Sequence, residues 1–463
     1  MAKANTQPAR GMRDFLPAEV RRREYVIGIV KEVYERYGFE PLETPAVENI
    51  ETLLGKYGDE GNQLIYKILK RGEHEKTGEA DLALRYDLTV PLARVVAEYR
   101  DKLPKFFKRY QIQPVWRADR PARGRFREFY QCDVDVLGSR SMIVEAEICS
   151  AASDVLTRLG FEDFRVRLNH RHALTGLLQS AGIAPEKHDA ALIALDKLDK
   201  IGGEGVQKEF ASRGIEPEAG GRLLQFFVDL QSLEHAADIA GPDSGAQKRN
   251  TMNAAILGRL VEFIQNNELG ARGIDQLRSI MKFAKASGIA DKIEIDPTLA
   301  RGLSYYTGAI MEINVKDLPG SLGGGGRYDN LVGMFAGQDI PACGFSLGLE
   351  RIIVVMTERE MFPGSLVTSP ADVMVSIWDD ETINESLGLA HELRVAGLRV
   401  DLYPEADKIG KQFKFASERK IPFVAIVGGD ERARGEVSIK DMRSGTQRSV
   451  KREYLIMTLR ESL

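Results

Sequence analysis

The sequence changes character twice, and this pattern restricts the possible folds more than any other feature. Strand-like and helix-like segments alternate up to about residue 180, helical periodicity alone runs from 181 to 290, and strand-like segments return at 293–315. Strands joined mostly by hairpins, with helices to one side, favour a largely antiparallel sheet and the α+β class. We therefore expect a helical domain inserted into a sheet domain. The predicted strands before the insertion are 65–70, 81–86, 106–117 and 125–137, with helices at about 88–100 and 141–159.

A helix and an extended segment are predicted before the sheet. After Pro17, apolar residues from Val26 to Tyr37 recur at three- and four-residue spacing, and Gly38 is placed to end the helix. Two prolines exclude helix from the following FEPLETPAVE (39–48). We expect an extended edge segment there, of the kind that lies at a sheet border or pairs with another chain.

The C-terminal part predicts a separate domain. A glycine-rich turn follows the returning strands and leads to a helix at about 348–358, and MFPGSLVTSPAD (361–372) has the composition of a linker. The segments after it alternate as β-α-β-α-β-β, which is typical of a small α/β domain with a mostly parallel sheet. The predicted domains are a core in two parts (1–180 and 291–362), a helical insertion (181–290) and a terminal domain (371–463).

Composition excludes several classes of protein. The 463 residues suffice for two or three domains, and a net charge of −4 excludes a polycation, so nucleic-acid binding would need local basic patches. Three cysteines (Cys132, Cys149 and Cys343) form no C-x-x-C pair, which predicts neither a disulfide framework nor a zinc site. No apolar signal core or membrane span is visible, so we expect a soluble, cytoplasmic protein.

The densest charge cluster is VWRADRPARGRFREF, which holds five arginines. Pro121 and Gly124 predict a turn between two strands, with Arg117 on the first strand and Arg125 and Arg127 on the second. Guanidinium groups on a sheet surface suit a phosphate-bearing ligand, because each can form two charge-assisted hydrogen bonds. The alternative is a solvated basic hairpin tip.

The second of these strands has a polar face. By the period of two, Gln131, Asp133 and Asp135 share one side, while Cys132 and its apolar neighbours share the other. Two acids within a core-like strand are costly unless they have partners. The partner is either a ligand ammonium or imidazole, or a neighbouring arginine.

Two further segments carry candidate ligand-binding residues. In LALRYDLTVPLARV, Asp87 and Thr89 lie where a strand gives way to a helix, and the pattern alone favours Asp87 as the helix N-cap over a ligand-binding residue. In TLARGLSYYTGAIMEI, Arg301 precedes a glycine that permits close backbone approach. Tyr305 and Tyr306 are expected to project to opposite sides of a strand, as core filler or as part of a binding edge.

The last two segments are weaker indicators when taken singly. SLGGGGRYDNLVGMF has four consecutive glycines, but it matches neither a Walker A loop nor the spaced glycines of a dinucleotide fold. In CGFSLGLERIIVVM, Arg351 stands in the first turn of a predicted helix. A cation there opposes the helix dipole, which favours a role for Arg351 in ligand binding.

The order of these segments resembles a known family. GFEPLETP, VWRADRPARGRFREFYQCDVD and GFSLGLERI are similar to the three signature motifs of class II aminoacyl-tRNA synthetases, in the same order. LARGLSYYTG and GGGGRYDNLVG resemble the two motifs particular to histidyl-tRNA synthetases. The resemblance covers essentially the whole chain. It implies a class II antiparallel sheet, a helical insertion, an anticodon-binding terminal domain and the ligation of histidine to tRNA(His) with ATP and Mg²⁺.

The resemblance also implies roles for individual residues. Arg117 would contact the ATP α-phosphate, Arg351 the far end of the nucleotide, and Arg301 the charge that develops during adenylate formation, with Arg125 also at the ATP site. Asp87, Thr89 and Gln131 would hold the histidine α-amino group, and Asp135 and Tyr306 would bracket its imidazole. The remaining histidine-site residues would be Leu88, Tyr305 and Tyr328.

Partners follow from the same resemblance. Arg123 and Arg125 are hypothesised to contact the tRNA acceptor end. Lys408, Lys411 and Lys414 form a basic stripe that suits a phosphate backbone, with a solvated helix face as the alternative. Segment 39–48 and its preceding helix would form a homodimer interface, and no direct protein metal site is predicted.

The match has departures and rivals. Many family members carry Asp at the position of Ser304, so a carboxylate beside Arg301 is lost here. One rival is a synthetase-like paralogue, such as the subunit that activates ATP phosphoribosyltransferase. Such paralogues usually lack the terminal domain or key arginines, both of which this chain retains. Another rival is an RNA-binding scaffold without catalysis.

Overall fold

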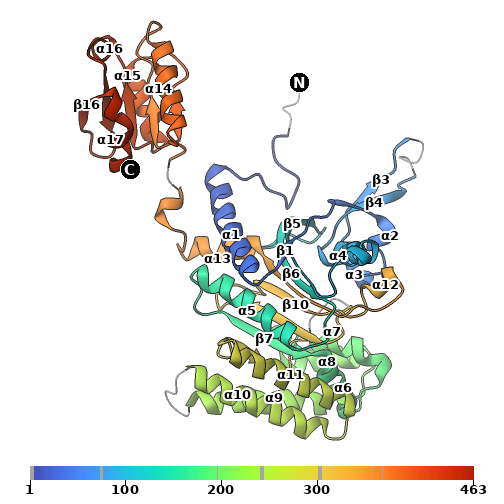
Figure 1. The fold of residues 1–463 in the computed structure, drawn as a ribbon. Helices are drawn as coiled ribbons and strands as arrows, with labels where there is room; N and C mark the ends of the chain where they lie inside the picture. Colours follow the sequence, from blue (N-terminus) through green and yellow to red (C-terminus); the bar gives the residue numbers. More distant parts are fainter. Residues whose placement is uncertain (1–4, 73–76, 196, 240–244, 301–304, 368) are drawn as a thin grey trace. The chain divides into compact units, whose positions relative to one another are not determined.

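The computed structural model describes residues 5–72, 77–195, 197–239, 245–300, 305–367 and 369–463. The chain divides into two compact units, Met1–Met361 and Phe362–Leu463. Each unit is built around its own sheet (Figure 1).

An eight-stranded sheet forms the centre of the first unit. Its outer pairs, β1–β5 and β7–β8, are parallel, and the other neighbouring strands are antiparallel. The predicted α+β class with a largely antiparallel sheet is confirmed, and β1 lies at the sheet border as expected for the proline-containing segment. The strands, in order across the sheet, are β1 (Glu40–Pro41), β5 (Phe107–Trp116), β6 (Glu128–Leu137), β11 (Ala342–Gly348), β10 (Gly323–Arg327), β9 (Ala309–Asn314), β7 (Arg165–His170) and β8 (Ile293–Ile295).

Three helices pack together on this sheet, namely α1 (Pro17–Arg36), α5 (Ile143–Arg158) and α13 (Leu349–Glu358). Helix α1 begins with a proline in its first turn and ends before Gly38, whose φ of +74° suits glycine. Its buried face includes Val26, Val30 and Val33. The Tyr34 hydroxyl donates to the Cys132 carbonyl at 3.2 Å, which fixes α1 against β6.

A smaller sheet lies beside the main one. Its order is β2 (Val47–Asn49), β4 (Ala80–Leu84) and β3 (Lys67–Leu69), with antiparallel pairing throughout. The chain leaves β4 and forms a short turn before α4 (Thr89–Glu98), so residues 87–89 occupy a strand-to-helix junction as the sequence predicted. Two short helices, α2 (Ile50–Leu53) and α3 (Gly58–Gln63), complete this part.

The helical segment follows β7, a strand that the sequence did not predict. Helix α6 crosses α11 closely: a Cβ on Gly176 would lie 2.5 Å from the Cα of Gly270, so glycine is required at the crossing. The chain then returns to the sheet through β8. The helices are α6 (Arg171–Ala181), α7 (His188–Leu195), α8 (Leu198–Ser212), α9 (Pro217–Ile239), α10 (Gly245–Ile264) and α11 (Glu268–Ala286).

The second unit has a five-stranded sheet of order β13-β12-β14-β15-β16. Only the two pairs that involve β12 are parallel, so the prediction of a mostly parallel sheet was wrong for half of it. The last two strands form a hairpin, whose short connection enforces antiparallel pairing. The elements are β12 (Val373–Val375), α14 (Ile383–Val395), β13 (Val400–Leu402), α15 (Ile409–Glu418), β14 (Phe423–Ile426), α16 (Gly429–Arg434), β15 (Glu436–Asp441), β16 (Gln447–Lys451) and α17 (Leu455–Ser462).

Candidate active site

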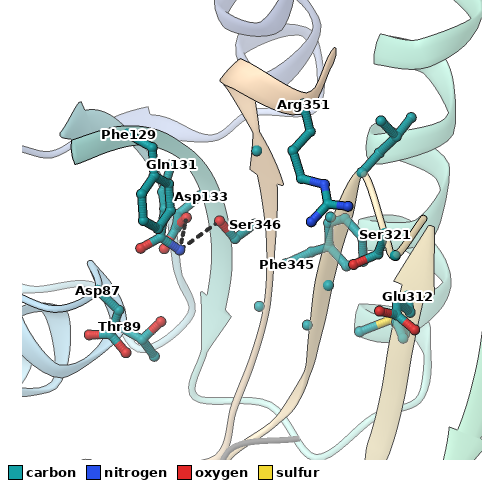
Figure 2. A pocket seen from close by; sticks show the side chains of 18 of the residues that line it. Asp87, Thr89, Phe129, Gln131, Asp133, Glu312, Ser321, Phe345, Ser346 and Arg351 are labelled. Carbon is teal, nitrogen blue, oxygen red and sulfur yellow. Dashed lines mark hydrogen bonds between the residues drawn. The ribbon is translucent and has the colours of Figure 1, made fainter. Parts of the chain in front are cut away.

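A cavity of about 480 Å³ lies over the polar face of β6. Its wall combines four strands of the main sheet with the junction at residues 87–89 (Figure 2). The turn before β9 also contributes to the wall. Of the candidate residues predicted from the sequence, those in the wall are Asp87, Thr89, Arg117, Arg125, Gln131, Asp135, Tyr305, Tyr306, Tyr328 and Arg351.

Strand β6 supplies the polar end of this cavity. The expected alternation is confirmed, since Gln131, Asp133 and Asp135 all line the cavity although each is buried. Gln131 donates to the Ser346 hydroxyl at 2.8 Å and, at 3.4 Å, to Asp133 (Figure 2). Its Oε1 is buried and has no hydrogen-bond partner among the described residues, so it is available as an acceptor.

The acids on β6 have a protein partner. The guanidinium of Arg109 on β5 lies 2.8 Å from Asp135 and 3.9 Å from Asp133. Of the two partners left open by the sequence, the structure therefore shows the neighbouring arginine. Asp135 also accepts from the Tyr328 hydroxyl, and Gly344 on the next strand leaves room for it, because a Cβ there would lie 1.8 Å from Asp135 Oδ1.

Burial nevertheless dominates the electrostatics of these acids. It raises the pKa of both Asp133 and Asp135, against the opposing effect of Arg109. Among the neighbouring groups, Arg109 therefore stabilises the ionised forms of the two carboxylates most.

Asp87 lies one residue before Leu88, the N-cap of α4, so the prediction of Asp87 as the N-cap is off by one residue. Its Oδ1 accepts from the Val90 backbone N–H at 3.0 Å, as a residue near a helix start does, and the side chain also faces the cavity. Tyr57 donates to it at 2.9 Å and Tyr305 at 3.4 Å. Burial raises the pKa of Asp87. Leu88, the next residue, is fully buried and contributes its carbonyl to Arg109 at 3.3 Å.

The paired tyrosines differ from the prediction. Tyr305 and Tyr306 precede β9 in a turn, and both line the cavity instead of projecting to opposite sides of a strand. Because the chain is not extended there, the period of two does not apply. Their rings meet edge to face at 5.1 Å, and Tyr305 also contacts the Tyr328 ring at 6.0 Å.

The other end of the cavity is basic. Arg117, Arg125 and Arg127 lie just outside the strands, in the connection between β5 and β6, and not on the strands as predicted; chain pairing continues there, with Arg117 N–H donating to Arg127 O at 2.9 Å. Arg117 also donates from Nε to the Tyr86 carbonyl at 3.1 Å, and its guanidinium lies over the rings of Tyr86 and Phe129.

Arg351 reaches the same end from the first turn of α13 and donates to the carbonyl of Pro319. Arg125 is exposed and paired with Asp119 at 2.9 Å. Arg123 is not among the described residues of the wall; it pairs with Glu358 and donates to the Asp317 carbonyl.

Arg301 and Ser304 lie outside the described residues. Leu299 and Tyr305, on either side of that segment, both line the cavity.

The glycine run is a strand and not the predicted turn. Gly323–Arg327 forms β10 between β9 and β11. A Cβ on Gly325 would lie 2.1 Å from the Gly344 carbonyl oxygen, and one on Gly326 would lie 2.4 Å from that of Ala309. Close backbone approach within the cavity floor, and not turn formation, explains these glycines.

Sequence reasoning missed Arg109, Tyr57 and Glu312. Arg109 was detectable in principle, because FKRYQIQ on β5 has the same alternation as β6, and Arg109 pairs directly with Asp135 across the two strands. Glu312 on β9 lines the cavity with Ser321 near Arg351 (Figure 2). Tyr57 lies in an irregular segment with no periodicity to mark it.

In the second unit, the predicted lysine stripe lies at the start of α15. Lys408 is the N-cap, and Lys411 and Lys414 follow on the helix, all exposed. Among all the described residues of the chain, no group of three histidine, cysteine or acidic side chains is placed to hold a metal ion. None of the helices in the described residues is long and apolar enough to cross a membrane.

Comparisons with known proteins point to one family. A family model described as histidyl-tRNA synthetase matches residues 11–352, and one described as anticodon binding domain matches residues 372–462. A histidine–tRNA ligase of Cytophaga hutchinsonii is 42% identical over 456 residues, which cover 95% of this chain and 96% of that protein.

Solved structures give the same result. The histidyl-tRNA synthetase from Nostoc sp. PCC 7120 is 33% identical with a TM-score of 0.78, and the alignment covers 100% of both chains. A structure described as an ATP phosphoribosyltransferase regulatory subunit/histidyl-tRNA synthetase from Bacillus halodurans C has a TM-score of 0.71 over 92% of this chain, but at 22% identity it shows only a shared fold. The matching family model and the 42% identity to a histidine–tRNA ligase over nearly the full length show that this chain belongs to the histidyl-tRNA synthetase family.

Proposed function

We propose that the cavity binds histidine at its acidic end and ATP at its basic end, joins them as histidyl-adenylate, and then passes histidine to tRNA(His). The observation that carries this proposal is the shared wall: Asp135 and Tyr306 line the same cavity as Arg117 and Arg351. An amino acid and a triphosphate need opposite environments side by side, and this cavity offers both.

Histidine is recognised by hydrogen bonds. Asp87, Thr89 and Gln131 hold the α-ammonium, for which the unpaired Gln131 Oε1 is a ready acceptor. Asp135 and Tyr306 bracket the imidazole. A site of this kind rejects apolar amino acids strongly, because its buried polar groups would be left unpaired. Tyr305 and Tyr328 support these residues by donating to Asp87 and Asp135. The carbonyl of Leu88 accepts from Arg109, which pairs with Asp135.

Adenylate formation needs charge stabilisation and no enzyme nucleophile. A carboxylate oxygen of histidine attacks the α-phosphorus of ATP, a new P–O bond forms, and the bond to the diphosphate breaks. Arg117 contacts the α-phosphate, Arg351 the far end of the nucleotide with Arg125 nearby, and Arg301 the developing charge. Preorganised donors of this kind are each worth roughly 3 kcal/mol in the transition state.

The wall also fits Mg²⁺ bound to the nucleotide. Mg²⁺ on a triphosphate needs only one or two protein carboxylates, with water and phosphate oxygens as its other ligands. Glu312 is a carboxylate of the wall on the same side as Arg351 (Figure 2). When bound, the ion would neutralise phosphate charge.

For tRNA, we propose contacts from both units. Arg123 and Arg125 on the β5–β6 connection contact the acceptor end. In the second unit, Lys408, Lys411 and Lys414 contact the tRNA backbone, and half-exposed Trp378 supports this assignment. Gln412 of α15 bonds both backbone groups of Ile377, the residue before Trp378, and the exposed part of the indole offers a stacking surface.

The chain is further proposed to act as a homodimer in the cytoplasm. The edge position of β1 leaves its outer side without a strand partner among the described residues, next to helix α1.

One assay tests the function. Histidine-dependent exchange of diphosphate into ATP should occur, followed by charging of tRNA(His). A folded protein without exchange would support the regulatory paralogue instead. Exchange with histidine but no charging of any tRNA would contradict the second step.

A further inference from the structure

We infer that Arg109, which lies behind the cavity wall, is a positioning residue that fixes the acids of the histidine site. This inference rests on the proposed histidine-binding roles and adds a residue to them. Arg109 acts through Asp135, Asp133 and the carbonyl of Leu88, and it does not belong to the described residues of the wall.

The contacts of Arg109 join two walls of the cavity. One terminal nitrogen reaches Asp135 at 2.8 Å, Asp133 at 3.9 Å and the Leu88 carbonyl at 3.3 Å. Asp135 belongs to β6, whereas Leu88 stands between the ligand-facing residues Asp87 and Thr89. A single guanidinium therefore sets the spacing between the part of the site for the imidazole and the part for the ammonium.

Arg109 is itself held in one conformation. It is fully buried, and its other terminal nitrogen donates to Gln111 Oε1 at 3.1 Å. Gln111 in turn donates to the hydroxyl of Thr44 at 2.9 Å and to Gln113 at 2.6 Å. Fully buried Arg85 completes the network by donating to Gln113 and to the Thr44 carbonyl. Such a network leaves little freedom for the guanidinium.

The site also requires the charge of Arg109. Asp87, Asp133 and Asp135 are three buried carboxylates in one wall, and burial raises the pKa of each. The groups that face the β6 pair are Asp87, Ser346 and the hydroxyls of Tyr306 and Tyr328, together with the buried thiol of Cys343. All of these groups are uncharged or negative. Arg109 is the cation in contact with the pair among the described residues, so its removal favours protonation of one acid.

A fixed Asp135 is suited to a specific ligand. Its Oδ1 accepts from Tyr328 and its Oδ2 faces Arg109, so the carboxylate is held from both ends. Each oxygen retains a further lone pair. An imidazole N–H that enters the cavity meets an acceptor whose position and ionisation are already set.

The test compares the apparent KM for histidine and for ATP in diphosphate exchange. Arg109→Met should raise the histidine KM by at least about tenfold, because the buried ion pair with Asp135 and the hydrogen bond to the Leu88 carbonyl are both lost, with the ATP KM changed less than about twofold. The acidic limb of the histidine KM profile should also move to higher pH. Arg109→Lys should recover part of the affinity, and so should Arg109→Met combined with Asp133→Asn, which removes one surplus charge.

Arg85→Met is the matched control, because Arg85 is equally buried in the same network but contacts backbone carbonyls and Gln113 and no cavity acid. Equal histidine KM shifts in Arg85→Met and Arg109→Met would overturn the inference. So would an unchanged histidine KM in the Arg109 variants while Asp135→Asn raises it. If Asp135→Asn also leaves the histidine KM unchanged, the proposed histidine site itself is wrong. If Arg109→Met does not fold, the histidine KM and ATP KM of Arg109→Lys and of Arg109→Met with Asp133→Asn test the inference instead.

Discussion

At the scale of single residues, two tyrosine hydroxyls in the cavity wall donate hydrogen bonds of different strength to buried carboxylates. The Tyr328 hydroxyl donates to Asp135, which Arg109 holds from its other side. The Tyr305 hydroxyl reaches Asp87 only at 3.4 Å, and Asp87 has a better donor in Tyr57 at 2.9 Å. The two tyrosines therefore offer a graded comparison.

We predict that Tyr328→Phe raises the histidine KM in diphosphate exchange by about tenfold, because a hydrogen bond to a buried carboxylate is lost without loss of the ring. Tyr305→Phe, the matched control, should change it by less than about threefold, since its bond is long. A larger effect of Tyr305→Phe would contradict this ranking of the two contacts.

At the scale of elements, the sequence predicted which residues share one face of a strand better than it predicted which strands pair with each other. The period of two on β6 correctly identified Gln131, Asp133 and Asp135 as one polar face. It could not show which strand lies alongside or in which register, so the direct pairing of Arg109 with Asp135 was not predicted. The glycine run was assigned to a turn by propensity, whereas tertiary packing of β10 between two strands decides its conformation.

Strand β10 gives a stability prediction. Gly325→Ala should strongly destabilise the first unit, lowering its melting temperature by several degrees or preventing folding. Its Cβ would lie 2.1 Å from one backbone oxygen and 2.6 Å from the Cα of Phe345, and neither atom can move alone. Gly324→Ala is the control, because its nearest neighbour lies at an ordinary 3.5 Å. Similar melting temperatures for the two variants would refute this account of the strand.

The start of α6 gives a pH prediction. His170 is fully buried, and its Nδ1 accepts from the His172 backbone N–H at 3.1 Å, which caps the helix. Burial lowers the pKa of His170 to about 3. The unfolded chain therefore binds a proton below pH 6.5 that the folded chain does not, so stability is full above pH 6.5 and falls as pH decreases towards 3.

His170→Asn keeps a capping acceptor but removes this titration. We expect the melting temperature of the variant to fall less than that of the unchanged protein between pH 7.5 and pH 5, measured in parallel. Identical pH dependence would show that His170 does not contribute to it.

At the scale of the whole molecule, the order of motifs predicted the fold class, the family and the presence of a C-terminal domain. The local pattern of apolar residues did not predict strand β7, because its sequence RVRLNH is short and runs directly into helix α6. It was also insufficient for the final hairpin strand, whose sequence QRSVK is polar and largely exposed. Short, polar or junction strands depend on their neighbours, which one sequence does not display.

The proposed dimer is testable at this scale. We expect sedimentation of two chains together at micromolar concentration, because β1 ends the sheet. Leu16, the N-cap of α1, and Val47 of segment 39–48 are large exposed apolar side chains at the two elements proposed for the interface. Charged substitutions at Leu16 and Val47 together should shift the population towards monomer. A monomer for the unchanged protein at that concentration would contradict the proposal.

The two units predict a separation of activities. In the proposed reaction, adenylate formation needs only the cavity of the first unit, whereas tRNA is proposed to contact α15 of the second unit as well. Changing Lys408, Lys411 and Lys414 to Gln should therefore weaken tRNA binding and reduce the slope of log affinity against log salt by about 2 to 3, one phosphate contact per lysine. Diphosphate exchange should be unchanged.

The control is Lys451→Gln, which changes an exposed lysine of the same unit on β16. This variant tests for a general loss of charge and should leave the slope nearly intact. Unaltered charging kinetics and salt dependence in the triple variant would mean that the stripe is only a solvated helix face, and that tRNA is bound elsewhere on the protein.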